Sequence, residues 1–483
     1  MKLSQIFDNA PDWEFTGLTC DSRKVAPGFV FAALLGTVSD GRDFIQAAID
    51  NGAIAVLTDE RDGEWEIPAI KVAEPRLAFA KAAAAFYHKQ PEVMVAVTGT
   101  NGKSSTVDFL RQIWTELGHV SASVGTLGAV GPSGAVELGH TTPDPVAVQS
   151  TLAILANEGV THCAMEASSH GLAQYRMHGV QLAAGGFLNL SQDHLDYHKD
   201  FEDYFAAKMK LFSELLPEGA PAIINADSDM KDKALAIATA ANLKPFTVGW
   251  RGDHLWIDEI SPRNTGQKLQ LQWETPEGDK ETIVNLPLIG EFQALNALAA
   301  AGIALSLGAD PMAVFAAMEK LKGVKGRLEL VAETQNGAGI FVDFAHTPDG
   351  LDTLLRAARP HAAGRVICVF GCGGDRDAGK RPIMGEIAAK YADEVIVTDD
   401  NPRSEDPASI RAAIMAGAPN ATEIDGREAA IKEGISRLKK GDVLMIAGKG
   451  HETGQIIKGE TFPFSDHEAA LTALAEIEGG AEK

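Results

Sequence analysis

The residues best suited to chemistry lie in the segment Gly99–Ser104, which reads Gly-Thr-Asn-Gly-Lys-Ser. An apolar run ends just before it at Val97, and apolar residues at helical spacing continue after it to Leu117, so the sequence predicts a strand, a glycine turn and a helix. Backbone N–H groups at the start of such a helix attract phosphate oxygens. Lys103 would neutralise the terminal phosphates of a nucleotide, and the Ser104 hydroxyl would bind Mg²⁺.

The spacing of this segment differs from that of the standard phosphate loop, because two residues rather than four separate its glycines. A glycine turn that happens to precede a lysine is the simpler alternative. The succession of strand, glycine turn, Lys-Ser and helix favours phosphate binding, and Gly99–Ser104 is called the phosphate loop below.

Polar residues that could bind a metal follow later in the chain. Glu166 ends an apolar run, where an acidic residue commonly holds the metal of a bound nucleotide, although a solvent-exposed glutamate is an equal alternative. His194 and His198 have the spacing of a zinc-binding helix, but no glutamate follows the first histidine. Magnesium or phosphate contact by His194 is therefore favoured, with a helix-capping polar turn as the alternative. Lys208 lies in an amphipathic helical segment, and composition does not distinguish it from Lys210.

Polar loops also follow four apolar runs near the C-terminus, at 339–343, 366–370, 394–398 and 443–447. Ligands of open parallel sheets bind at the carboxyl ends of strands, so these loops are candidate binding residues. The planar fork of arginine suits carboxylate and phosphate. The polar residues of this region are Arg327, Asp343, Arg376, Asp399, Asp400, Asn401, Arg403 and Glu452.

Composition limits the class of protein. The chain has 483 residues, 45% hydrophobic and 23% charged, as in globular proteins of several domains. A net charge of −23 argues against non-specific binding to nucleic acid or to an anionic membrane. No run is apolar enough for a membrane span, the first residues predict no secretory signal, and the four scattered cysteines are typical of a reducing compartment. A cytoplasmic protein without membrane insertion is expected.

The alternation of strand and helix patterns predicts an α/β protein with parallel β/α units. Its parts would be residues 1–88, 89–324 and 325–483, the first boundary falling at Gln90-Pro91. In the first part, Asp21-Ser22-Arg23 is typical of a turn.

Ten segments together resemble the Mur ligase family across nearly the whole chain. They are Thr98–Ser104, Glu166–Gly171, Asp193–His198, Ala206–Lys208, Gly290–Asn296, Gly326–Glu329, Asp343–Asp349, Gly371–Arg376, Asp400–Arg403 and Gly448–Glu452. The departures are small: Phe344 stands where tyrosine is common, and Ser104 where threonine is common. The resemblance implies a UDP-substrate domain, a central ATPase with a mostly parallel sheet and a C-terminal Rossmann-like domain.

The resemblance also implies roles for individual residues. ATP would contact Gly99, Thr100, Asn101, Gly102, Lys103, Ser104, Ser105, Asn296, Arg327 and Asp343. The substrate UDP-MurNAc-L-Ala-D-Glu would contact Ser22, Thr141, Thr142, Ser168, Gln174 and Arg176. The incoming amino acid would contact Arg376, Asp400, Asn401, Pro402, Arg403, Gly448 and Glu452. Ser104, Glu166 and His194 would bind Mg²⁺, expected as two ions, and Lys208 would be carbamylated.

The implied activity is a peptide-bond-forming step of peptidoglycan synthesis by a monomer. ATP would phosphorylate the D-Glu γ-carboxylate, and the amine of meso-diaminopimelate would attack the acyl phosphate. Arg403 would pair with the far carboxylate of diaminopimelate, which lysine lacks, and the resemblance also favours the diaminopimelate type.

Two rival functions remain. A folylpolyglutamate synthase or cyanophycin synthetase would share the central ATPase, but residues 1–88 and the Asp400–Arg403 motif speak against both. A nucleotide-switched binding protein would lack a use for the C-terminal polar loops, and no N-K-x-D base-reading motif is present.

Overall fold

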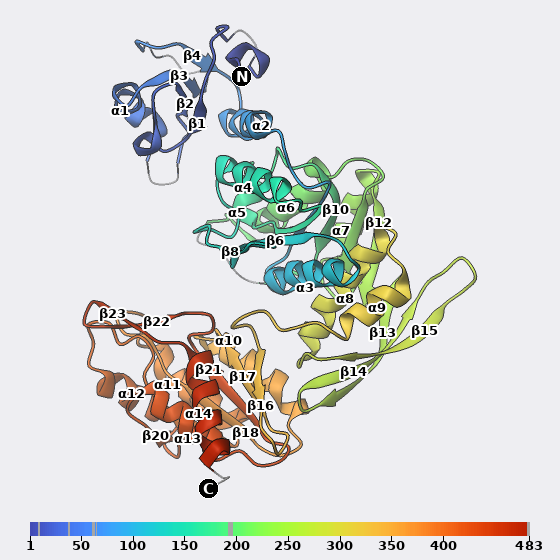
Figure 1. The fold of residues 1–483 in the computed structure, drawn as a ribbon, viewed down its shortest axis with the longest axis vertical. Helices are drawn as coiled ribbons and strands as arrows, with labels where there is room; N and C mark the ends of the chain where they lie inside the picture. The colour runs from blue at the N-terminus through green and yellow to red at the C-terminus, as the bar shows by residue number, and fades with distance from the viewer. Residues whose placement is uncertain (8–9, 37–38, 60–62, 64, 192–196, 481–483) are drawn as a thin grey trace. The chain divides into compact units, whose positions relative to one another are not determined.

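The computed structural model describes residues 1–7, 10–36, 39–59, 63, 65–191 and 197–480 (Figure 1). These residues form two compact units. The first comprises residues 1–248 and 299–310, and the second comprises 249–298 and 311–483. The His194 prediction lies outside the described residues.

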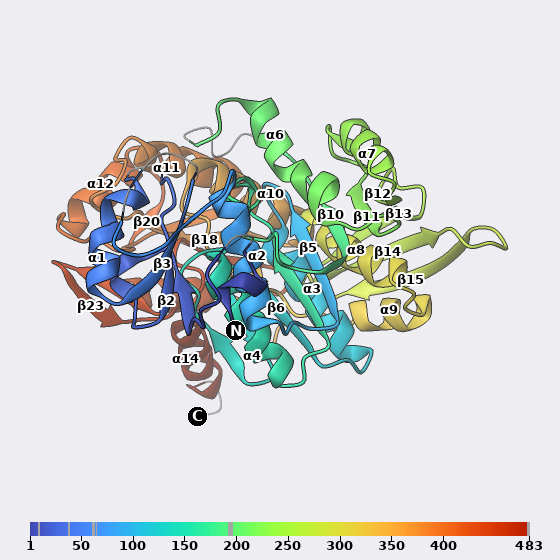
Figure 2. The same ribbon diagram turned by 90° about the horizontal axis from the view of Figure 1, so that it is seen from above.

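The N-terminal part of the first unit is a four-stranded parallel sheet between two helices. Its strands, in spatial order, are β1 (Gly17–Thr19), β2 (Phe29–Ala32), β3 (Ala53–Thr58) and β4 (Ala69–Lys71). Alternate residues of β2 and β3 join different cores, one with α1 (Ile45–Asp50) and one with α2 (Pro75–Tyr87), so the helices cover opposite faces (Figure 2). Asp21 caps a short helical turn at Ser22–Lys24, which confirms the predicted turn.

The central sheet positions the phosphate loop. Its first-unit strands, in spatial order, are β12 (Lys244–Gly249), β11 (Pro221–Asn225), β10 (Leu182–Phe187), β5 (Val93–Thr98), β9 (His162–Glu166), β6 (Ser121–Gly125), β7 (Gly128–Gly131) and β8 (Gly134–Val136). The strands from β12 to β6 are parallel, and β7 and β8 are antiparallel. The helices of this region are α3 (Lys103–Glu116), α4 (Pro145–Asn157), α5 (Ser169–Ala173), α6 (Phe201–Lys210) and α7 (Lys231–Ala240).

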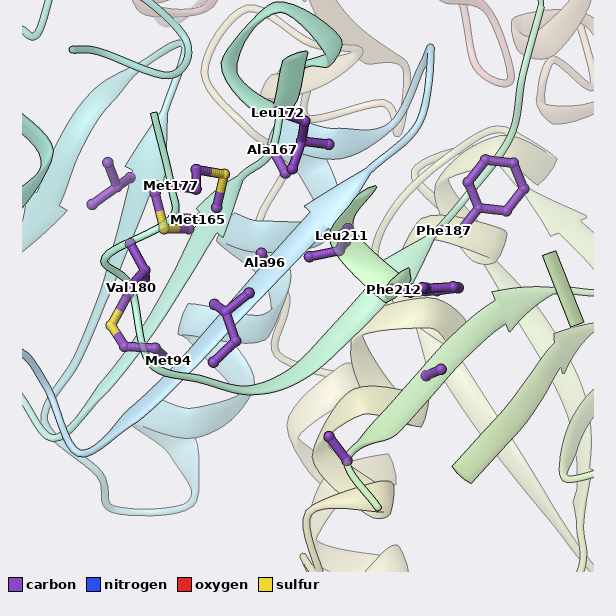
Figure 3. Packing of buried hydrophobic residues seen from close by; sticks show 14 of the residues in the cluster. Met94, Ala96, Met165, Ala167, Leu172, Met177, Val180, Phe187, Leu211 and Phe212 are labelled. Atoms are coloured by element: carbon purple, nitrogen blue, oxygen red, sulfur yellow. The ribbon is translucent and has the colours of Figure 1, made fainter. Parts of the chain in front are cut away.

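Strand β5 lies inside this sheet, between β10 and β9, and is buried on both faces, as expected for a parallel strand covered by helices. Met94 and Ala96 pack in one core with Met165 of β9 and Phe187 of β10 (Figure 3). The loop at the end of β5 therefore starts from a strand with little freedom to move.

The second unit begins with an antiparallel meander that the strand patterns did not identify: β13 (Leu255–Arg263), β14 (Gly266–Trp273) and β15 (Lys280–Leu286). Burial alternates along β14, which is the pattern of a sheet with one covered face. Helix α8 (Glu291–Ser306) begins in this unit and ends in the first, and α9 (Pro311–Met318) lies in this unit.

The C-terminal sheet has the order β16-β17-β21-β18-β19-β20, with β16 (Glu329–Glu333) antiparallel to β17 (Gly339–Asp343). The remaining strands, β21 (Val443–Ala447), β18 (Val366–Phe370), β19 (Glu394–Val397) and β20 (Thr422–Glu423), are parallel to β17. Four of the five parallel strands match the predicted runs, so their polar loops share one edge of the sheet. Helices α10 (Pro348–Ala358), α11 (Lys380–Tyr391), α12 (Pro407–Met415), α13 (Arg427–Ser436) and α14 (Asp466–Gly480) and the hairpin β22 (Gly454–Ile457) and β23 (Glu460–Pro463) complete the region.

Each helix in the described part of the chain is too short or too polar to cross a membrane.

Candidate functional site

The phosphate loop joins β5 to α3, as the sequence predicts. Gly102 precedes the helix with φ +87°, a left-handed conformation that disfavours other residues. The Lys103 Nζ donates to the carbonyl oxygens of Gly99 and Thr100, both at 2.9 Å. The loop therefore curls around its own lysine, with the cation and the start of α3 at the same place.

Glu166 lies beside this loop at the end of β9 and is only 2% exposed, so the solvent-exposed alternative is wrong. Its carboxylate accepts from the Ser104 hydroxyl at 2.8 Å and from the Thr126 amide at 2.8 Å. A Cβ at Gly125 would approach a Glu166 oxygen to 2.1 Å, so a larger residue here would displace the Glu166 carboxylate. Thr126 and Gly125 belong to no motif, so the sequence does not predict either contact.

The oxygen atoms of Ser104 and Glu166 fit Mg²⁺, a hard cation that prefers carboxylate and hydroxyl oxygens. No group of three His, Cys, Asp or Glu side chains suited to a metal occurs within the described residues. Substrate phosphates commonly complete the coordination of Mg²⁺, so two protein oxygens are compatible with such a site.

The structure separates the two lysines that composition left equivalent. Lys208 is 1% exposed, donates to the Gly99 carbonyl oxygen at 2.7 Å and lies 4.4 Å from the Tyr204 ring centroid. The Tyr204 hydroxyl lies 3.3 Å from the Thr100 hydroxyl, so this helix is bound to the phosphate loop at two points. Lys210 instead lies over Tyr175, away from the loop.

Five of the six residues predicted for the nucleotide-sugar substrate join one hydrogen-bonded network. Thr142 donates to the Glu166 carbonyl and accepts from the Ser168 amide. Arg176 donates to the Thr142 carbonyl at 2.7 Å and to the Gln174 side chain at 2.8 Å. The Thr141 hydroxyl lies 3.0 Å from that of Thr126.

The sixth predicted residue, Ser22, lies in the N-terminal part, where its carbonyl accepts from Asn51 at 3.0 Å. The hydrogen bonds of the described residues do not join it to the other five. This substrate network and the phosphate loop nevertheless meet at Glu166, which contacts residues of both.

Three residues predicted for ATP lie in the second unit. Asn296 donates to the Gln293 side chain at 3.3 Å, and Gln293 donates to the Arg327 carbonyl at 3.2 Å. Asp343 accepts from the amides of Leu328 and Ala345, each at 2.7 Å. Burial raises the pKa of the Asp343 carboxyl above its ordinary value, against the opposing effect of these two donors.

A buried histidine holds the start of α8, which carries Asn296. His361 is 4% exposed, and its Nδ1 lies 2.8 Å and 3.0 Å from the carbonyl oxygens of Arg263 and Gly266. Because carbonyls only accept, Nδ1 carries the hydrogen, and the neutral Nε2 accepts from the Gly290 amide at 2.8 Å. Burial lowers the pKa of His361, which favours this neutral form.

The C-terminal loops form a cavity of about 740 Å³. Six of the seven residues predicted for the amino acid line it, namely Arg376, Asp400, Asn401, Arg403, Gly448 and Glu452. Pro402 does not line it. Its wall also includes Phe344, His346, Lys380 and Ile383, to which the sequence analysis gave no part in amino-acid binding.

Charged and amide groups of this cavity are held by neighbours. Arg403 donates to the Gly374 carbonyl at 2.8 Å, and a Cβ at Gly373 would come within 2.7 Å of its guanidinium. The Asn401 amide donates to Glu452 at 3.0 Å. Burial would raise the pKa of Glu452, but hydrogen bonds from Asn401 and Lys449 hold it below its ordinary value, so the carboxyl is ionised at neutral pH.

A buried ion pair ties two loops of the cavity together. Arg427 and Asp466 are both buried and make two hydrogen bonds of 2.7 Å. The Arg427 guanidinium also donates to the carbonyls of Asp399 and Ala447, at the ends of β19 and β21. The role of Arg427 is not predictable from the sequence, because its partners are distant along the chain.

Three family descriptions match successive parts of the chain. The family description "Mur ligase family, catalytic domain" matches residues 14–94. "Mur ligase middle domain" matches residues 97–304, and "Mur ligase, glutamate ligase domain" matches residues 326–450.

Proteins named UDP-N-acetylmuramoyl-L-alanyl-D-glutamate–2,6-diaminopimelate ligase are similar over nearly the full length. The protein from Bradyrhizobium diazoefficiens is 53% identical over 96% of this chain and 95% of its own. That from Agrobacterium fabrum is 51% identical over 96% of this chain and 94% of its own. A solved structure of a protein with that name is 32% identical and covers 100% of both chains, with a TM-score of 0.78.

Proposed function

Because the chain belongs to the Mur ligase family, we propose that it is an ATP-dependent ligase that adds meso-diaminopimelate to UDP-MurNAc-L-Ala-D-Glu. The observation that carries the proposal is the gathering of Arg403, Asn401 and Glu452 around one cavity. The names of relatives at 53% and 51% identity support the same substrates.

In the first step the phosphate loop binds ATP. Its backbone N–H groups and Lys103 contact the phosphates, and the D-Glu γ-carboxylate attacks the γ-phosphorus. The bond between the β–γ bridging oxygen and that phosphorus breaks, which yields an acyl phosphate and ADP. Ser104 and Glu166 would hold Mg²⁺, which neutralises phosphate charge when bound. Asn296 would contact the adenine, Asp343 the ribose and Arg327 the phosphates.

In the second step the amine of the amino acid attacks the acyl carbon. The carbon–oxygen bond to phosphate breaks, inorganic phosphate leaves and the amine loses a proton. Thr141, Thr142, Ser168, Gln174 and Arg176 would hold the nucleotide-sugar peptide beside Glu166, with Ser22 at the uridine. The work of the protein is positioning and charge neutralisation.

Lys208 would act as a carbamate. A neutral lysine amine adds to CO₂ and loses a proton, which turns a cation into an anion. The carbamate nitrogen keeps one N–H, so the hydrogen bond to the Gly99 carbonyl can persist. The new anion would then assist a second magnesium ion beside the phosphate loop.

The cavity would distinguish diaminopimelate from lysine by charge. Arg403, assisted by Asn401 and Arg376, would pair with the far carboxylate, and Glu452 with the Gly448 carbonyl would receive the far ammonium. With lysine bound, Arg403 would face a cation without its anion, which is unfavourable where water is excluded.

The test is mass spectrometry of the product formed from ATP and UDP-MurNAc-L-Ala-D-Glu with diaminopimelate, with lysine, or with neither. We expect a nucleotide tripeptide with diaminopimelate and phosphate release that depends on the amino acid. Turnover with a folate and glutamate in place of these substrates would support a folylpolyglutamate synthase. Phosphate release without any product would support a nucleotide switch. A monomer located in the cytoplasm stays a prediction.

A further inference from the structure

Lys449 is a buried cation directly behind the cavity. It lies in the loop after β21, its side chain is fully buried, and it is absent from the cavity wall. Its Nζ donates to Asn401 Oδ1 at 3.1 Å and to Glu452 Oε2 at 3.0 Å. Both partners line the cavity, so Lys449 touches two wall residues without touching the space that they enclose.

Lys449 and the Ile456 backbone together fix the orientation of the Asn401 amide. Asn401 Oδ1 accepts from Lys449 and from the Ile456 backbone N–H at 2.9 Å, and neither of these groups can accept a hydrogen bond. The oxygen must therefore face them and the NH₂ group must face the other way. One hydrogen of that group is used by Glu452, which leaves the second for an acceptor.

The same contact balances the charge of the cavity. Glu452 carries a carboxylate on the cavity wall, and without a cation it would repel a carboxylate in the cavity. Lys449 neutralises this charge from the buried side, while one Glu452 oxygen remains outside its contact. The wall thus offers Asn401 and Arg403 as donors and a balanced Glu452 as an acceptor.

We propose that Lys449 is a positioning residue that makes the cavity selective for an amino acid whose side chain ends in both a carboxylate and an ammonium. The proposal rests on the proposed ligase function. In it, Lys449 acts through Asn401 and Glu452 and never contacts the substrate. A cavity without Lys449 would keep Arg403, and the Ile456 N–H would alone hold the Asn401 oxygen, but Glu452 would lose the charge balance that lets a carboxylate enter.

The experiment replaces Lys449 by methionine, which keeps the length of the side chain and removes its donor and charge. Initial rates of tripeptide formation are measured with diaminopimelate and with lysine, over a range of ATP concentrations. We expect kcat/KM for diaminopimelate to fall by about 10- to 100-fold, the usual range for losing a hydrogen bond to a charged group. With lysine the fall should be smaller, so that the diaminopimelate-to-lysine ratio drops, and the KM for ATP should stay within about twofold of wild type.

Three further variants separate positioning from folding. Lys449→Arg keeps the cation and should retain most of the preference for diaminopimelate. The double variant Lys449→Met with Glu452→Gln leaves no uncompensated charge at this contact, so it should fold with a thermal midpoint near wild type. Its diaminopimelate-to-lysine ratio should rise above that of Lys449→Met, because residue 452 no longer repels the far carboxylate. Lys440→Met changes an exposed lysine and should leave all constants unchanged.

A wild-type ratio in Lys449→Met, or a ratio in the double variant no higher than that of Lys449→Met, would overturn the proposal and leave the ligase function standing. An equal fall of kcat/KM with diaminopimelate and with lysine, in a Lys449→Met protein with a wild-type thermal midpoint, would also overturn the proposal. A general structural role of Lys449 predicts that result. If the wild-type protein adds neither amino acid, the proposed function itself is wrong.

Discussion

The polar side chains of the phosphate loop and those of the amino-acid cavity are held in place in different ways. The loop is one continuous segment, and its lysine is held by carbonyls only three and four residues away. In the cavity, Arg403 is held by Gly374 and Asn401 by Glu452, residues that belong to different loops. A site of the first kind depends on its own sequence, whereas a site of the second kind depends on buried residues behind its wall, here Lys449 and Arg427.

The strongest test of this comparison is Lys103→Ala. If the loop is self-contained, we expect a fall in kcat of about 1000-fold, as for loss of a group that stabilises transition-state charge. Binding of diaminopimelate, measured by calorimetry, should be unchanged. A loss of amino-acid binding in this variant would break the separation between the two regions.

Lys208→Ala should lower kcat by about 100-fold, somewhat less than Lys103→Ala, because the carbamate would act on phosphate charge through the metal. Depletion of CO₂ should slow the wild type, and labelled bicarbonate should give a carbamate NMR signal that the variant lacks. Lys210→Ala is the matched control on the same helix and should give neither effect. Full activity in CO₂-free buffer would contradict carbamylation.

Arg403→Ala should raise the KM for diaminopimelate by about 10- to 100-fold, because a charge-assisted pair with the far carboxylate is lost. The KM for ATP should change by less than about twofold, since the phosphate loop contains its own cation. Steady-state kinetics in both substrates is the measurement, with the exposed Arg356→Ala as control. Equal effects on both KM values would contradict the role of Arg403 in binding the far carboxylate.

The smallest effect concerns His361, whose pKa is lowered from 6.5 by burial. When the segment around His361 opens, its imidazole is no longer buried and binds a proton more readily than in the closed form. The free energy of local opening therefore falls as pH falls below 6.5. Amide exchange of residues 289–293 should therefore lose protection, by at most about tenfold per pH unit after correction for intrinsic rates. His361→Gln keeps an acceptor for the Gly290 amide but does not titrate, so this dependence should vanish; its persistence would exclude His361 as the source.

Local pattern predicted much of the fold. The strands at 339–343, 366–370 and 443–447 have the predicted bounds, because buried parallel strands are short apolar runs that end at polar loops. The meander β13–β15 contains no continuous apolar run like those that identified the other strands, although the alternation of polar and apolar residues along β14 is itself the signal of a half-buried strand.

The sequence by itself determined the phosphate loop, since glycine, lysine, serine and helix start are adjacent along the chain and bring the phosphate-binding groups together without a distant partner. It also predicted which polar loops share an edge, because parallel strands end on the same side of a sheet. Only the tertiary structure decided that Glu166 is buried against Ser104, that Lys208 rather than Lys210 reaches the loop, and that Lys449 stands behind Asn401 and Glu452. These contacts join residues far apart in the chain, and burial, which gives them their strength, is a property of the packed molecule alone.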